Sequence, residues 1–336
     1  MSFNKVDQTT GVTTPIAGLN GITIDSTPTE GSTNAVQSGG VYDALSLKQF
    51  SNPNLLDNPW FTVNQRGFSS TSSSGGYTVD RWKNSYGDLT ISLSNNVLTF
   101  TKPDTSTDSA LVQYIPMDTG KYLLGKTLTY SVLLEDDEIC STTFTLPSEV
   151  PASQKFYGFR KIPNKDIEYF YIDFCLHPNG AAAGHEYYVR IGSHVANATI
   201  SIKAVKLEIG SVSTLAMDTV PNYQQELAKC QRYFVRYNAN NIVSIASAYA
   251  VSTSDLRFDI PLPVVMRSEP SVSYSALTDF VYTLTTYANG TNPTSIASAG
   301  NSFGIMKPIK FGGTFTTSTL YEIDCKDGYL DLSADL

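Results

Sequence analysis

Apolar and polar residues alternate along most of residues 54–215, and this period of two predicts short antiparallel β-strands. The run "DLTISLSNNVLTF" alternates on both sides of Asn95-Asn96, which predicts a hairpin with a tight turn at the two asparagines. Further strands are predicted in "LVQYIPM", "KTLTYSVLL", "STTFTLP", "IEYFYIDFCLH", "EYYVRIG" and "ATISIKAVKLEIG". No helical pattern separates these runs, so residues 54–215 are predicted to form a β-sandwich of the jelly-roll kind.

A second β unit is predicted over residues 232–336, where alternation returns in "NIVSIASAYAV", "LRFDIPLPVVM", "PSVSYSAL", "FVYTLTTYA", "TFTTSTLYEIDC" and "GYLDLSAD". A linker helix is predicted between the two units, within residues 216–231, with Pro221 near its first turn. Roughly helical spacing relates four residues of this stretch, Tyr223, Leu227, Cys230 and Phe234.

The N-terminal region differs from the rest of the chain. Residues 1–32 are rich in Thr, Gly and Pro and carry only isolated apolar residues, which predicts a segment that is either disordered or laid along another protein. The spacing of the apolar residues favours the second alternative. A short helix is predicted within residues 33–50, because Ser38 is a suitable N-cap. Such a helix is marginal alone, and we favour its self-association as a coiled coil over packing on its own β domain. Its apolar face carries the candidate oligomerisation residues Val41, Ala44, Leu45 and Lys48.

Composition narrows the classes of partner. The net charge is −8 and the pI about 4.9, so neither nucleic acid nor an anionic membrane surface is expected as a partner. No apolar run reaches the ~18 residues of a membrane helix, so membrane insertion is not expected. "MSFNKVDQTTGVTTP" lacks the basic and apolar regions of a signal peptide, so we expect synthesis in a cytoplasm without signal-dependent secretion.

No cofactor or metal is expected. The cysteines, Cys140, Cys175, Cys230 and Cys325, are scattered without a CxxC pair, and Cys140 and Cys175 fit the pattern of buried hydrophobes. The acidic run at residues 135–138 has oxygen ligands for Ca²⁺, but an exposed turn between strands is the favoured interpretation. The histidines are His177, His185 and His194. His185-Glu186 does not continue to the second histidine of a zinc protease motif, since residue 189 is Val189.

One string does match a nucleotide-binding pattern. "GKYLLGKT" places Gly120, Gly125, Lys126 and Thr127 at the fixed positions of a P-loop. A P-loop opens a helix, whereas the residues after Thr127 alternate as in a strand. The string therefore predicts a turn at Gly125 that leads into a β-strand.

No enzyme motif is complete, so we expect a protein that is not an enzyme. Asp80, Asp173 and Asp255 are available as acids, but nothing in the sequence places two of them together. Aromatic rings can stack on sugars, and Trp60 and Trp82 are candidates, although their apolar neighbours favour burial as structural residues. Tyr282 and Tyr287, beside "ANGTNPT", are expected to be exposed and are the candidate glycan-binding residues.

Four stretches resemble parts of phage and prophage fibre proteins. "GSTNAVQSGGVYDAL" is similar to the helical segment of such fibres. "NLLDNPWFTVNQRG", with "YTVDRW" and "IKAVKLEIGSVST", resembles their jelly-roll module and carbohydrate-binding modules. "NYQQELAKCQRYF" resembles the helix-to-strand joint that follows, and "LRFDIPLPVVMRSEPSV" resembles the C-terminal β unit.

The resemblance implies a homotrimeric fibre in the virion, attached through residues 1–32, with distal β domains that adhere to host-surface glycans. It fits a tail fibre and a capsid-attached head fibre alike. A glycan-degrading appendage enzyme is the other alternative, and it would need acid, base or nucleophile side chains gathered in one pocket.

Overall fold

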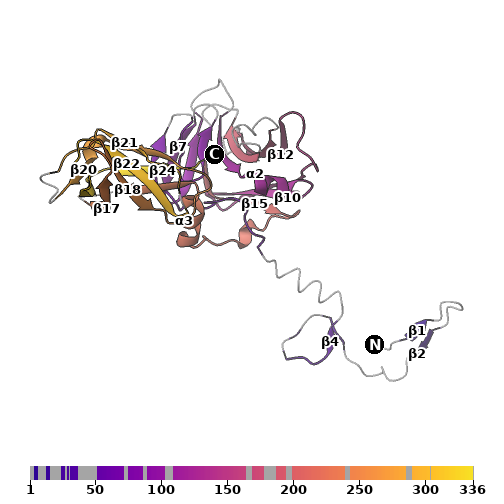
Figure 1. Ribbon diagram of the computed structural model, residues 1–336. Coiled ribbons are helices and arrows are strands. Elements are labelled where there is room, and N and C mark those ends of the chain that lie inside the picture. The colour runs from indigo at the N-terminus through magenta and orange to yellow at the C-terminus, as the bar shows by residue number, and fades with distance from the viewer. Residues whose placement is uncertain are drawn as a thin grey trace. The chain divides into compact units, whose positions relative to one another are not determined.

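The computed structural model describes residues 4–6, 13–15, 24–26, 29, 31–36, 51–71, 75–85, 89–102, 109–163, 169–177, 187–193, 199–238, 243–284, 290–302 and 304–335. The protein is mainly β, as the alternating pattern predicts, and its sheets are antiparallel apart from one pair of short strands near the N-terminus (Figure 1). Residues 1–52 form one unit and residues 53–336 a second, larger one.

The described residues of the N-terminal unit form two pairs of short strands. β1 (Asn4–Val6) pairs antiparallel with β2 (Thr13–Pro15), and β3 (Ile24–Asp25) pairs parallel with β4 (Ala35–Val36). The Asp25 carboxylate accepts hydrogen bonds from Ser32 at 2.5 Å and from Asn34 at 3.0 Å, and these bonds lower its pKa. The predicted oligomerisation residues Val41, Ala44, Leu45 and Lys48 lie outside the described residues.

Two facing sheets make up the first part of the larger unit. The six-stranded sheet has the order β11 (Ile139–Thr145), β10 (Thr127–Leu134), β15 (Thr199–Ile209), β8 (Val97–Thr101), β7 (Thr90–Ser94) and β5 (Ser70–Thr71). The five-stranded sheet has the order β12 (Lys155–Pro163), β13 (Tyr169–Leu176), β14 (Tyr187–Ser193), β9 (Ser109–Ile115) and β6 (Lys83–Ser85).

One hydrophobic core joins these two sheets. Phe100, Leu128 and Leu207 from the six-stranded sheet and Ile172 and Val189 from the five-stranded sheet belong to the same buried cluster. Because one face of each sheet is buried in this way, the register of every strand is fixed by its alternating pattern. The outer face of the five-stranded sheet is also partly covered, since Ala110, Val112, Tyr114, Cys175 and Tyr188 cluster with Tyr233.

Two predicted turns are confirmed. β7 and β8 form the hairpin at Asn95-Asn96, whose φ angles of 50° and 61° are the left-handed values that such a turn needs. The acidic residues 135–138 form the exposed turn between β10 and β11. Asp137, at φ 69°, accepts a hydrogen bond from Lys203 at 2.7 Å.

The P-loop-like string has the expected turn and strand, with an unpredicted helix before them. α2 (Met117–Leu123) precedes Gly125, which has φ 73°, and β10 begins at Thr127. Gly120 lies inside α2 against the ring of Tyr187, where an added Cβ would come within 2.1 Å of Cδ2. The glycine is therefore explained by close packing of α2 on β14.

Two more sheets form the C-terminal part. The first is three-stranded, with the order β16 (Phe234–Asn238), β24 (Tyr329–Ser333) and β19 (Ser271–Tyr274). The second is six-stranded, with the order β20 (Phe280–Thr283), β23 (Leu320–Cys325), β17 (Val243–Ala250), β18 (Asp255–Pro261), β22 (Met306–Gly312) and β21 (Ser295–Ser298). They share a second core, which includes Val235, Leu332, Phe258 and Phe311.

The linker between the two parts contains the short helix η2 (Leu215–Met217) and the helix α3 (Tyr223–Gln231), and another short helix, η3 (Leu277–Asp279), precedes β20. The helix predicted within residues 216–231 is thus present as α3, capped by Asn222, and of the four residues at helical spacing Cys230 and Phe234 are buried. The buried residues of α3 are Glu226 and Cys230, while Tyr223 is 47% exposed. Glu226 is buried because it is a hydrogen-bond acceptor for the backbone of Asn58.

The close contact at Gly120 gives a stability prediction. Alanine at an ordinary helix position is favoured over glycine by about 1 kcal/mol. Gly120→Ala should instead lower the free energy of unfolding by about 1–3 kcal/mol, because the methyl group would overlap the Tyr187 ring. Urea unfolding followed by circular dichroism measures the change.

Gly76→Ala is the matched control, since nothing lies within 4 Å of a Cβ built there. Equal stabilities of the two variants would contradict the packing explanation.

Candidate functional site

A tightly held loop at residues 58–63 is the starting point of the candidate site. The buried Asn58 side chain donates to the carbonyl oxygens of Val63 at 2.8 Å and Asp80 at 3.0 Å, and it accepts from the Val63 N–H at 2.9 Å. Its own N–H donates to Glu226 Oε1 at 2.6 Å, and its carbonyl accepts from the Trp82 indole at 3.2 Å. One asparagine thus fixes the loop against two distant segments, residues 80–82 and the helix α3.

The conformation of the same loop explains why the two tryptophans differ in burial. Phe61, at φ 55°, has a left-handed backbone that bulky residues rarely adopt, and its ring is buried edge-on against Trp82 at 5.8 Å. Trp82 is fully buried, as predicted. Trp60 is only half-buried, so its prediction as a buried structural residue is wrong. The strained backbone turns Phe61 inward and leaves Trp60 at the surface.

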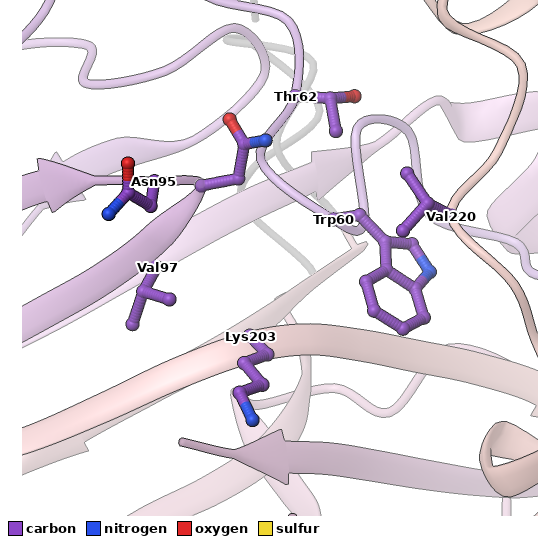
Figure 2. Close-up of a pocket in the computed structure, with 7 residues that line it drawn as sticks. Trp60, Thr62, Asn95, Val97, Lys203 and Val220 are labelled. Carbon is purple, nitrogen blue, oxygen red and sulfur yellow. The ribbon is translucent and has the colours of Figure 1, made fainter.

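Trp60 lines a pocket of about 210 Å³ (Figure 2). The other lining residues come from the same loop, from the β7–β8 hairpin, from β15 and from the linker; they are Thr62, Asn95, Asn96, Val97, Lys203 and Val220. The Pro59 carbonyl accepts from the Val205 N–H at 2.9 Å, so the Trp60 loop is bonded to the strand that carries Lys203. The pocket is therefore built on fixed backbone.

The polar groups of the pocket are mostly amides and hydroxyls. Asn95 and Asn96 are exposed at the end of a rigid hairpin, and Lys203 is the ionisable residue in the lining. The Lys203 ammonium donates to Asp137, whose side chain is 79% exposed. The Thr62 hydroxyl oxygen is buried and has no hydrogen-bond partner in the part of the chain that the structure describes.

The carboxylates with unusual environments lie elsewhere, where the two cores meet. Asp80 is buried and accepts from the Gln65 backbone N–H at 2.6 Å and from its side chain at 2.8 Å. Burial raises the pKa of Asp80, and Arg66, at 3.7 Å, opposes that shift. Arg66 also pairs with Asp335, and the Gln65 side chain donates to the Phe234 carbonyl at 2.8 Å.

Two further arginines complete this polar joint. Arg81 is buried, with its guanidinium 3.1 Å from Asp57 and 3.4 Å from the centre of the Tyr233 ring. Burial lowers the pKa of Arg81, but Asp57 and Tyr233 outweigh it and the net shift is upward. Arg236 binds Asp331 through two bonds of 2.6 Å and donates to the Arg66 carbonyl at 2.8 Å. Because these charged groups pair with other protein groups, their role is to join the two parts of the larger unit.

The other predicted candidates are not brought together. Asp173 is buried in a two-bond pair with Arg190 at 2.9 and 2.7 Å, and Asp255 begins β18. Tyr282 is only 6% exposed, so its predicted exposure is wrong; it packs against Phe315 and Tyr321 in the second core. Tyr287, His185 and His194 lie outside the described residues, and His177 follows β13.

The environments of the four cysteines make their thiols poorly reactive. Cys140, Cys175, Cys230 and Cys325 are free and buried. Burial raises the pKa of each thiol, that of Cys325 to about 11, so all four stay protonated and weakly nucleophilic near neutral pH.

Neither a metal-binding cluster in the described residues nor a matching family model identifies the site. Within the described ranges, no three His, Cys, Asp or Glu side chains are placed to hold a metal ion. The helices of the described chain are all too short or too polar to cross a membrane. No protein-family model matches the sequence. No curated protein matches it either.

The role of Asn58 in holding the loop at residues 58–63 can be tested by measuring the free energy of unfolding. Asn58→Ala should lower the free energy of unfolding by about 2–5 kcal/mol, because it leaves a buried N–H and two buried carbonyls unpaired. It also places alanine at φ 50°. Denaturant unfolding monitored by circular dichroism gives the value.

The control is Asn301→Ala, an exposed position that should change stability by less than about 0.5 kcal/mol. If both variants unfold at the same denaturant concentration, Asn58 does not organise the loop.

Proposed function

We propose that this protein is a structural and adhesive fibre of a bacteriophage virion. Its N-terminal residues 1–32 attach it to the particle, and its β sheets are available to bind host-surface glycans. The proposal is supported by the four sequence stretches that resemble phage fibre proteins and by the mainly β architecture. In this proposal the two cores correspond to two jelly-roll-like sandwiches, residues 54–215 and 232–336, joined by the linker helix.

Binding is favoured over catalysis because the buried carboxylates lie away from the Trp60 pocket. The Trp60 pocket is lined by an aromatic ring, amides, a hydroxyl and one lysine, with no carboxylate or histidine. The buried Asp80, Asp173 and Glu226 pair with protein groups. General acid–base catalysis needs such groups within reach of a bound substrate. A glycan-degrading enzyme is therefore the weaker alternative.

The place of the fibre on the particle separates the two remaining alternatives. A tail fibre and a capsid-attached head fibre share the same chemistry and differ only in the protein that holds residues 1–32. Gold-labelled antibodies raised against this protein, viewed on intact virions, should mark fibres that project from the particle. Label along the tail supports the first alternative and label on the capsid the second. Virions that carry no label would contradict the proposal.

The predicted N-terminal helix gives a test of assembly. We expect the full chain to sediment as a homotrimer, with Val41, Ala44, Leu45 and Lys48 facing the threefold axis. Leu45→Asp should reduce the trimer to smaller species, because three carboxylates would be brought into an apolar seam. Analytical ultracentrifugation measures the mass.

Ser46→Asp introduces the same charge at the adjacent position, which lies off the predicted face, and should leave the trimer intact. A full-length chain that sediments as a monomer at micromolar concentration would refute trimeric assembly.

A further inference from the structure

We infer that the Trp60 pocket binds one neutral pyranose ring of a saccharide. This inference deepens the proposed adhesive function and rests on it for its biological setting. It assigns a joint binding role to Trp60, Asn95, Asn96 and Lys203. The sequence pattern alone does not group these four residues. Four observations support the assignment: the state of Trp60, the hydrogen-bonding groups, the local charge and the volume of the pocket.

The first observation is the contrast between the two indoles. The Trp82 ring is buried, and its N–H donates to the Asn58 carbonyl. Trp60 is half-buried, and no described residue accepts a hydrogen bond from its N–H. A large ring with an apolar face and a free donor suits the face of a sugar ring, which has C–H groups on one side and hydroxyls at its edge.

Rigidity makes this ring a better binding surface. The neighbouring Asn58 and Phe61 both have left-handed φ angles, and Asn58 is bonded on every side. Strained backbone that the surrounding structure enforces is common at binding sites. Because the loop is already ordered, a ligand loses less binding free energy to the ordering of Trp60.

The second observation is the set of polar partners around the ring. Asn95 and Asn96 are exposed, and each amide carries both donor and acceptor groups. The left-handed hairpin turn fixes the backbone that presents them. Lys203 adds donors from β15 on another side of the pocket, as Figure 2 shows. Mixed donors and acceptors match vicinal hydroxyls, which both donate and accept.

The third observation is the charge beside the pocket. The Lys203 ammonium is already paired with Asp137 at 2.7 Å. Asp137 belongs to the exposed acidic turn with Glu135, Asp136 and Glu138, and the Glu135 N–H bonds to the Ser201 carbonyl, two residues from Lys203. These carboxylates disfavour an anionic ligand, and the lysine in the lining disfavours a cationic one. A neutral ligand is the class that remains.

The fourth observation is size. The volume of about 210 Å³ lies below the roughly 300–1,000 Å³ of sites for drug-sized ligands. The pocket therefore accepts one ring, with the rest of a glycan chain in solvent. Binding to a single ring in a shallow site is expected to be weak, with a Kd of about 1 mM.

Ligand-detected NMR on the full chain tests the inference. The probes are the methyl glycosides of glucose and of N-acetylglucosamine, with methyl glucuronide as the acidic counterpart. We expect saturation transfer to at least one neutral glycoside and a roughly tenfold or greater loss of affinity in Trp60→Ala. Asn96→Gly keeps a residue suited to the left-handed turn while it removes one amide, and it should weaken binding several-fold.

Tyr122→Ala is the matched control, because Tyr122 is 64% exposed and does not line the pocket. It should bind as the parent chain does. Unchanged thermal unfolding of Trp60→Ala would exclude misfolding as the cause of lost binding.

Three results would overturn the inference. If no neutral glycoside gives a Trp60-dependent signal, the pocket is not a saccharide site, although trimer mass and virion labelling would leave the proposed function standing. If methyl glucuronide binds more tightly than the neutral probes, the ligand class is wrong. If the Trp60 fluorescence is protected from quenchers only in the assembled oligomer, a second copy of this chain occupies the pocket.

Discussion

The buried amide of Asn58 is the interaction on which the larger unit depends most. Its side chain and backbone bind Val63, Asp80, Trp82 and Glu226, which lie up to 168 residues away in the sequence. A hydrogen bond of this kind contributes only about 1 kcal/mol net, but leaving any of these buried groups unpaired costs more. The sequence thus has little freedom here, and the conformation of the Trp60 loop follows from it.

The charged side chains between the two cores and those at the pocket have different surroundings. At the joint, Arg66, Arg81 and Arg236 pair with Asp335, Asp57 and Asp331, and Arg81 donates to the Tyr114 carbonyl. The two cores therefore meet through directional polar bonds as well as through the apolar contacts of Tyr233. At the pocket, Lys203 is half-buried and its partner Asp137 is exposed, so this surface ion pair contributes little to stability. The arginines therefore join the two cores, whereas the Lys203 pair lies at the surface beside the pocket.

Local patterns predicted the strands and the tight turns, because alternation and left-handed asparagines act within a few residues of each other. The same reasoning missed α2, whose Gly120 makes sense only against the ring of Tyr187, and the burial of Glu226 in α3, which satisfies a distant N–H. It also predicted burial for Trp60, which is only half-buried, and exposure for Tyr282, which is buried. Whether an aromatic ring is buried depends on the backbone angle of its neighbour and on contacts between sheets, which a linear pattern does not encode.

The joint also orders events during synthesis. Arg66 pairs with Asp335, which is 269 residues later in the chain, and the Ala334 N–H bonds to the Tyr233 carbonyl. At roughly 5–20 residues per second, a ribosome adds Asp335 some 15–50 s after Arg66. During that interval Arg66 cannot reach Asp335 and its guanidinium stays hydrated. The ion pairs of the joint that involve Asp331 and Asp335 therefore form only after nearly the whole chain has been made.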